Sequence, residues 1–190
     1  LTVTGRLALC GLSSHGVGVF MNDLKTHETG DGLMWPALIR KLLREESSSS
    51  ALDCLTHNLP ASGHHYLLGD RQSAYSVETT GQRSDVFRQL RGDGFLCHTN
   101  HYLGNMSGAG VDASLGGTTF PRLETSEAYF SRAGKRTVES IAEELFGAEL
   151  DAGGVAMAGS TGGAAAITCA GMLMDLNTLS GFVFPESYSH

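Results

Sequence analysis

Six consecutive residues near the middle of the chain form the densest group of side chains that could do chemistry: Cys97-His98-Thr99-Asn100-His101-Tyr102. The group follows an apolar pair and precedes a glycine-rich stretch, and functional residues commonly gather where a strand runs into a loop. Cys97, His98 and His101 are residue types that bind metal ions, but no second ligand pair with zinc-site spacing accompanies them. Cys97 and His98 also have the chemistry of a nucleophile and its base, but adjacent side chains on a strand face opposite sides. Both readings stay open, and neither is favoured.

Two neutral amides suggest a different chemistry, the stabilisation of negative charge on an oxygen atom. An oxyanion needs a fixed, uncharged N–H donor, and the side-chain amide of Asn100 is of that kind. Asn22 is a second amide in an apolar setting, at the end of a strand-like run. The structural alternative for Asn22 is a turn former at a strand end, and for the Asn100 region it is hydrogen bonding to the following loop.

Composition and charge exclude several classes of protein. The chain has 190 residues, and its 13 Lys and Arg against 20 Asp and Glu give a formal charge of −7. Nucleic-acid affinity draws on surplus positive charge, so we expect no nucleic-acid partner. Hydrophobic residues make up 41%, enough to build a core, and the length fits a single domain over residues 1–190. No apolar run approaches the ~20 residues that cross a bilayer, so no membrane partner is expected.

Cysteine usage indicates the compartment. Cys10, Cys54, Cys97 and Cys169 are far apart and form no C-x-x-C pair. Such isolated thiols are typical of a reducing environment, which predicts a cytoplasmic protein without a disulfide framework.

The elements that must position these residues can be predicted from hydrophobic periodicity. Residues 1–10 and 17–24 indicate a β-hairpin with a glycine-bearing turn. Helical spacing then predicts helices over 35–43 and 51–59, with Ser47–Ser50 supplying an N-cap for the second. Short runs bounded by turns predict strands at 65–68, 74–79, 85–90 and 94–98. Residues 104–117 contain almost nothing large enough to pack, which predicts a long loop.

The second part of the chain returns to helices and ends in another hairpin. Residues 126–146 carry apolar residues that predict one or two helices, and 164–175 with 179–185 predict a closing hairpin. Strands in runs and helices in runs indicate an α+β fold with antiparallel sheets. We expect the two terminal hairpins to share one sheet, with these residues side by side: Val3, Leu7, Leu9, Val17, Val19, Ile167, Leu173 and Phe182.

Three stretches of the sequence resemble a known enzyme family. They are 11–24 (GLSSHGVGVFMNDL), 68–70 (LGD) through 77–80 (VETT), and 98–103 (HTNHYL). Their order and spacing resemble the acyl-coenzyme A:6-aminopenicillanic acid acyltransferase family, also called isopenicillin N acyltransferases, the peptidase C45-like branch of the N-terminal-nucleophile (Ntn) hydrolases. The closing hairpin also looks like the last strand pair of that family.

The resemblance implies an αββα sandwich with antiparallel sheets, a precursor that cleaves itself, and a cysteine that becomes a new N-terminus. That cysteine attacks an amide or thioester carbonyl, with its own α-amino group as base. None of the four cysteines falls at the matching position. We therefore expect the chain to be the C-terminal part of such a domain, incomplete at its N-terminus and inactive alone, with the upstream nucleophile-bearing segment of the same precursor as its partner.

By this resemblance Asn100 takes the oxyanion-hole position, Asn22 lines the cleft, and His98 and His101 support the site from behind. The implied function is amide-bond hydrolysis or acyl transfer on a small acylated substrate, with acyl-CoA as one candidate donor and with no cofactor or metal. One alternative is a non-catalytic homologue that serves as a binding or assembly subunit. Another is a metal-dependent enzyme that uses Cys97, His98 and His101.

Overall fold

The structure is a computed structural model that describes residues 8–110, 118–132, 134–146 and 170–185. The chain divides into two compact units. The first comprises Leu1–Leu115 and Met174–Ser180, and the second comprises Gly116–Leu173 and Gly181–His190.

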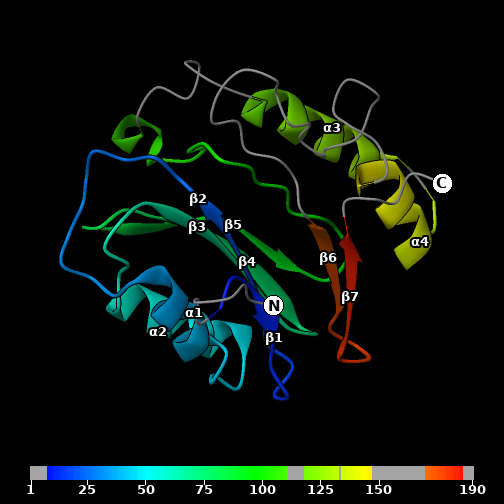
Figure 1. Ribbon diagram of the computed structural model, residues 1–190, viewed down its shortest axis with the longest axis horizontal. Coiled ribbons are helices and arrows are strands. Elements are labelled where there is room, and N and C mark those ends of the chain that lie inside the picture. The colour runs from blue at the N-terminus through cyan, green and yellow to red at the C-terminus, as the bar shows by residue number, and fades with distance from the viewer. Residues whose placement is uncertain (1–7, 111–117, 133, 147–169, 186–190) are drawn as a thin grey trace. The chain divides into compact units, whose positions relative to one another are not determined.

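A five-stranded antiparallel sheet is the main element of the first unit (Figure 1). Its strands lie side by side in chain order: β1 (Gly11–Leu12), β2 (Gly18–Asp23), β3 (His64–Gly69), β4 (Ser73–Thr79) and β5 (Ser84–Arg91). A β-bulge between Ser76 and Val77 shifts the register of β4 against β5. Because every strand pairs with its neighbour in the sequence, side chains of four successive strands align in rows across the sheet.

A tight turn joins β1 to β2 and sets the register of that hairpin. The amide of Ser13 donates to the carbonyl oxygen of Val17 at 2.9 Å, and the amide of Gly16 donates to that of Ser13 at 3.0 Å. Gly16 has a φ of 89°, in the left-handed region that a side chain makes unfavourable. Glycine at this position therefore lets the chain reverse and begin β2.

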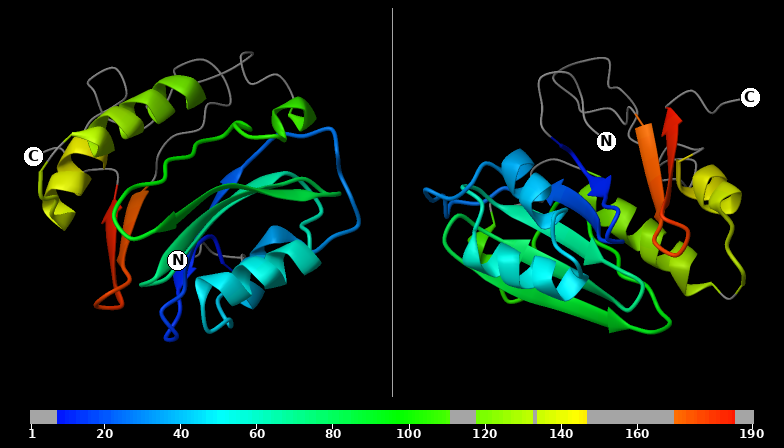
Figure 2. Two further views of the ribbon diagram at one scale, coloured as in Figure 1. Left: turned by 180° about the vertical axis from the view of Figure 1, so that it is seen from behind. Right: turned by 90° about the horizontal axis from the view of Figure 1, so that it is seen from below.

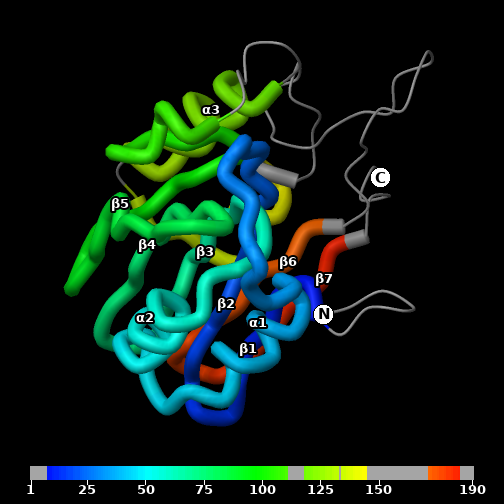
Figure 3. Tube along the Cα trace, turned by 90° about the vertical axis from the view of Figure 1, so that its left-hand side faces the viewer, coloured from blue at the N-terminus to red at the C-terminus, as the bar shows by residue number. Residues whose placement is uncertain are grey.

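Two helices, α1 (Trp35–Leu42) and α2 (Ser48–His57), cover one face of this sheet (Figure 3). In α1, Pro36 occupies the first turn, where its missing N–H leaves no helical bond unmade. In α2, the side chains of Ser47 and Ser50 form a reciprocal capping box. The helix starts are thus encoded locally in the sequence.

The core lies between these helices and the sheet, and it sorts the residues of each strand by face. Tyr66, Leu68 and Val77 point to the helices and are fully buried with Leu38 and Leu55. Because side chains alternate along a strand, the residues between them point to the opposite face. That opposite face carries the polar residues considered below.

The second unit holds α3 (Thr119–Ser131), the short helix α4 (Val138–Ile141) and the single π-helical turn η3 (Ala142–Phe146). Thr137 and Ser140 form a capping box at the start of α4. The hairpin of β6 (Ala170–Asp175) and β7 (Ser180–Pro185) is a separate two-stranded sheet. Its tip, residues 174–180, belongs to the first unit, where Arg71 donates to the backbone oxygens of Leu176 and Asn177.

The α+β class with antiparallel sheets is confirmed, as are the two helices after β2 and strands β3 to β5. Two predictions about strands are wrong. Residues 94–98 form no strand, and among the described residues Val19 lies in the five-stranded sheet whereas Leu173 and Phe182 lie in the two-stranded one. Val3, Leu7 and Ile167, which we expected in the shared sheet, lie outside the described residues.

Two boundaries differ most from the predicted ones. The first strand of the opening hairpin is Gly11–Leu12. Residues 8–10, the described part of the predicted strand 1–10, are not in a strand. Helix α3 begins at Thr119, before the predicted 126, because Pro121 belongs to its first turn, the one part of a helix that proline tolerates.

Candidate functional site

A row of polar side chains crosses the sheet on the face away from the helices. The registers align Asn22 on β2 with His65 on β3, His65 with Glu78 on β4, and Glu78 with Asp85 on β5. His65 and Glu78 are buried. Buried polar groups require hydrogen-bond partners, so this row must be satisfied by whatever covers the face.

The segment that follows β5 runs over the face of the sheet away from the helices (Figure 2), and its residues hydrogen-bond to this row. The carboxylate of Glu78 accepts a hydrogen bond from the backbone N–H of Leu103 at 2.6 Å and another from that of Gly104 at 3.2 Å. It also lies 2.9 Å from the Nε2 atom of His98. One buried side chain of β4 therefore holds both ends of the 98–104 segment.

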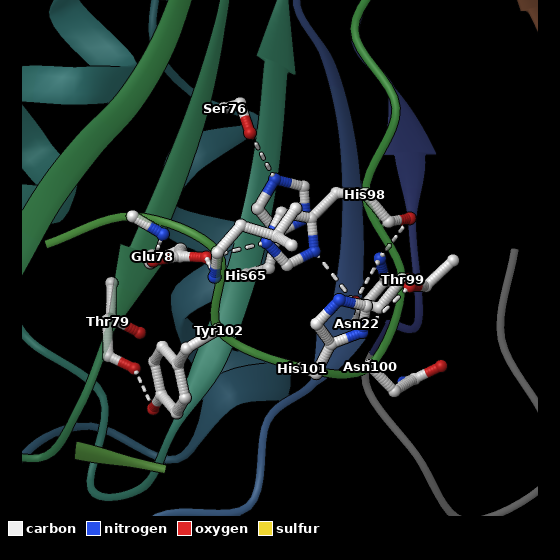
Figure 4. A network of polar contacts seen from close by, with 12 residues as sticks. Asn22, His65, Ser76, Glu78, Thr79, His98, Thr99, Asn100, His101 and Tyr102 are labelled. Atoms are coloured by element: carbon white, nitrogen blue, oxygen red, sulfur yellow. Dashed lines mark hydrogen bonds and ion pairs between the residues drawn. The ribbon is translucent and has the colours of Figure 1, made fainter. Parts of the chain in front are cut away.

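Asn22 holds the same segment from β2. Its side-chain amide donates to the backbone carbonyl oxygen of His98 at 3.1 Å and to that of Thr99 at 3.3 Å (Figure 4). Asn100, the next residue, donates from its own side chain to the backbone oxygen of Asp23 at 3.0 Å. Asn100 is exposed, whereas the residues on either side of it, Thr99 and His101, are buried.

Both ring nitrogens of His98 face oxygen atoms within hydrogen-bond distance. Its Nδ1 atom lies 2.7 Å from the carbonyl oxygen of Thr99, which can only accept. The oxygen of Glu78 that faces its Nε2 atom already accepts from a backbone N–H, as an ionised carboxylate does. This geometry is that of an imidazolium paired with a carboxylate, in which both ring nitrogens donate.

His65 lies flat against this charged ring. The two ring centroids are 3.6 Å apart, and the planes differ by 2°. Burial lowers the pKa of His65 well below its usual value, and the charge on His98 lowers it further. His65 is therefore the neutral member of the stack, with its Nε2 atom 2.8 Å from the hydroxyl of Ser76.

The residues after Asn100 point inward. The Nδ1 atom of His101 lies 3.3 Å from the hydroxyl of Thr99. The hydroxyl of Tyr102 donates to the backbone oxygen of Thr79 at 2.8 Å, and burial raises the pKa of Tyr102 to about 12. The structure thus brings Asn22, His98, Asn100 and His101 together, with Asn100 as the exposed member.

Two of the three described cysteines lack the lowered pKa of an activated nucleophile. Cys10 and Cys97 are buried and Cys54 is partly buried. Burial raises the pKa of the Cys10 and Cys54 thiols, whereas a nucleophilic cysteine needs a lowered one. Cys169 lies outside the described residues. Within those residues no group of three or more His, Cys, Asp or Glu side chains could hold a metal ion, so Cys97, His98 and His101 do not form such a group.

A comparison with protein families places this geometry in context. The family model for acyl-coenzyme A:6-aminopenicillanic acid acyl-transferase matches residues 2–147. The chain belongs to this acyltransferase family. The match includes every residue of the polar row and of the segment that covers it. The α+β fold with antiparallel sheets is consistent with the Ntn-hydrolase-like fold of the acyltransferase family. Among curated proteins none matches the chain.

Reasoning from the sequence missed two residues that hold this part of the acyltransferase fold, His65 and Glu78. The pairing of His65 with Glu78 could have been predicted from sequence. If the two strands that flank the turn after Gly69 pair residue by residue, His65 lies opposite Glu78. No local signal linked Glu78 to His98. In the described part of the chain no helix is both long and apolar enough to cross a membrane.

Proposed function

We propose that this protein is an amide-bond hydrolase or acyltransferase of the N-terminal-nucleophile type that acts on a small acylated substrate. Asn100 donates a hydrogen bond to the oxyanion, and the nucleophile is a cysteine in a preceding segment of the same precursor. The substrate contributes an amide or thioester carbonyl, with acyl-CoA as one candidate donor. Membership of the acyltransferase family supports this class of reaction.

The placement of Asn100 is the single observation that carries the proposal. Asn100 is exposed and its amide is oriented by a hydrogen bond to the backbone oxygen of Asp23, while Thr99 and His101 beside it are buried and their segment is tied to β2 and β4. Developing negative charge is stabilised best by a donor that is already oriented and needs no reorganisation. A neutral amide on a fixed backbone meets that requirement.

Neither His98 nor His65 is placed to act as the base. Both ring nitrogens of His98 face oxygen atoms of Thr99 and Glu78 within hydrogen-bond distance, so neither is directed at a thiol. His65 is almost fully buried beneath the His98 ring. An N-terminal cysteine needs neither residue, because its own α-amino group is the base.

The reaction then proceeds in two steps. The thiolate attacks the carbonyl carbon, and the carbonyl oxygen becomes an oxyanion that accepts a hydrogen bond from Asn100. Collapse of this intermediate expels the amine or thiol, which takes up the proton, and leaves a thioester on the enzyme. Water or an amine then attacks the thioester, giving hydrolysis or transfer.

The test uses the full-length precursor. Mass spectrometry of the purified protein should find a new N-terminal cysteine, and a panel of acyl amides and acyl-CoA thioesters should reveal turnover. Asn100→Ala should lower kcat by about 10²–10³-fold with little change in KM. The matched control is Asn105→Ala, an exposed amide just after the 98–104 segment that should keep the parent's activity.

Three results would contradict the proposal. Full activity of Asn100→Ala would remove the oxyanion role. Turnover by residues 1–190 alone that Cys97→Ala abolishes would favour an internal nucleophile. A full-length protein that binds acyl substrates without turnover would favour the alternative, a non-catalytic binding or assembly subunit.

A further inference from the structure

We propose that Glu78 and His98 form a positioning pair, a buried carboxylate–imidazolium contact that fixes the 98–104 segment and thereby orients the amide of Asn100. This inference rests on the proposed function, since it takes Asn100 as the oxyanion donor. Neither Glu78 nor His98 touches the substrate in this proposal. Both act on the reaction through the backbone that carries Asn100.

The burial of the pair is the first observation. The side chain of Glu78 is 0% exposed and that of His98 is 2% exposed, and their facing atoms are 2.9 Å apart. Two charges removed from water lose hydration that their mutual attraction only partly replaces. Such a pair is weak evidence for added stability, and fixing one conformation is a better reason to place it here.

The second observation is where the hydrogen bonds fall along the chain. Glu78 contacts His98, two residues before Asn100, and also the N–H groups of Leu103 and Gly104, which follow it. These contacts bracket Asn100 from both sides and attach the segment to β4. Asn22 attaches the same segment to β2 (Figure 4).

The third observation is the surroundings of His98. His65 on β3 stacks on its ring, and Phe87 on β5 meets the ring edge-on with centroids 6.1 Å apart. The other charged side chain of the row is Asp85 on β5, whose carboxylate accepts from Asn105 at 3.3 Å. Glu78 is thus the carboxylate that contacts His98. The rings of His65 and Phe87 restrict the movement of the His98 ring.

The arrangement explains how a buried charge can control an exposed amide. With Glu78 ionised, its two oxygens match three N–H donors. A glutamine at the same place has one oxygen and one NH₂ group. The NH₂ group can only donate, so it would face N–H donors without forming hydrogen bonds to them. The segment must then shift, and a displacement of about 1 Å at a catalytic group can slow a reaction by 10²-fold.

Glu78→Gln in the full-length protein tests this. We expect kcat to fall by about 10²-fold with KM nearly unchanged, as for a lost transition-state contact. The control Glu46→Gln makes the same chemical change at an exposed carboxylate before α2 and should keep the parent's kcat. The double variant Glu78→Gln/Asn100→Ala should be no slower than Asn100→Ala alone, because both changes remove the same contact.

The outcomes separate the two proposals. Normal activity of Glu78→Gln beside a slow Asn100→Ala would overturn the positioning role and leave the proposed function standing. The positioning role would also be overturned if the two fold-losses in kcat multiplied in the double variant, since Glu78 would then act independently of Asn100. An active Asn100→Ala would contradict the proposed function itself.

A second pair of variants and one spectroscopic measurement cover the case in which Glu78→Gln fails to fold. His98→Gln keeps an N–H donor toward Glu78 and should retain more kcat than His98→Leu, which has none. Equal, parent-like kcat in both would contradict the proposal. In the parent protein at pH 7, ¹⁵N NMR of the His98 ring should show two protonated nitrogens, and a singly protonated ring would overturn the ion pair.

Discussion

The imidazole ring of His98 lies on that of His65 with centroids 3.6 Å apart and planes within 2° of parallel. Only one of the two rings carries a charge. His98 donates through both nitrogens and is paired with Glu78, whereas the buried His65 has a pKa well below its usual value. A second positive charge at this distance would face the first without a carboxylate of its own.

This stack predicts that the folded state loses stability in mild acid. The folded pKa of His65 is lowered, and burial lowers that of His64 as well. The unfolded chain takes up these protons near pH 6.5, so the stability they contribute is present above that pH and is lost as the pH falls below it. Each proton taken up on unfolding lowers the free energy of unfolding by about 1.4 kcal/mol per pH unit.

Urea denaturation at pH 8, 7, 6 and 5 measures this dependence. His65→Gln should flatten the curve below pH 6.5, whereas His57→Gln, at an exposed helix end, should leave its slope unchanged. An equally steep curve in His65→Gln would show that His65 is not the group responsible.

Asn22→Ala should loosen the segment that carries Asn100. It leaves the backbone oxygen of His98 without its side-chain donor and removes one of the two donors to the oxygen of Thr99, which costs about 1–3 kcal/mol where water cannot replace them. Hydrogen–deuterium exchange should become faster in peptides covering 95–104 and stay unchanged in α1. Asn58→Ala removes a similar amide bond, to the oxygen of Cys54 on α2, and should leave 95–104 protected. Unchanged exchange in Asn22→Ala would contradict the tethering role of this amide.

Gly104→Ala should disturb the same contacts from the other end. A Cβ at this position would lie 2.9 Å from a ring carbon of Phe87 and 3.4 Å from an oxygen of Glu78. Overpacking of this kind costs about 1–3 kcal/mol, read as a lower melting temperature and a lower kcat. At Gly108 a Cβ would meet nothing within 4 Å, so Gly108→Ala is the control and should melt no lower than the parent. A melting temperature of Gly104→Ala equal to that of Gly108→Ala would contradict this prediction, because it would show that the Phe87 side chain can move aside without cost.

The regular elements of the first unit could be predicted from sequence because their signals are local. Helix α1 follows from apolar residues at helical spacing after Pro36, and α2 from the Ser47 cap. Strands β3 and β4 follow from short runs bounded by turns, one of them the turn after Gly69. Each of these signals lies within about ten residues of the element it predicts.

The arrangement around Asn100 could be predicted only in part. The residue types at 97–102 indicated a site, but the apolar pair Phe95-Leu96 also suggested a strand that does not form. That segment is held by side chains of β2 and β4 instead of by a strand partner. A short apolar run does not reveal whether a neighbouring strand or side-chain hydrogen bonds will hold it in place. The contact of Glu78 with a histidine twenty residues later depends on the fold as a whole. The catalytic and supporting roles assigned to Asn100, Asn22, His98 and His101 stay predictions.

Asp70→Ala should detach the start of α2 from the turn between β3 and β4. One carboxylate oxygen of Asp70 accepts from the N–H and the hydroxyl of Ser48, and the other accepts from the N–H groups of Gln72 and Ser73. Partial burial alone would raise the pKa of Asp70, but these hydrogen bonds lower it on balance. We expect the variant to lose about 1–3 kcal/mol in the free energy of unfolding at pH 7.

The pH dependence of that loss distinguishes the carboxylate from a merely space-filling side chain. Because the folded pKa is lowered, the contribution is fully present above the unfolded pKa of about 3.9 and is lost as the pH falls through the folded pKa. The difference between parent and Asp70→Ala in urea midpoint should therefore be largest at pH 7 and shrink below pH 4. Asp53→Ala, at an exposed position on α2, should change the midpoint little at either pH, within about 0.5 kcal/mol. A difference between parent and Asp70→Ala that is as large at pH 3 as at pH 7 would mean that the charge of Asp70 contributes nothing to this contact.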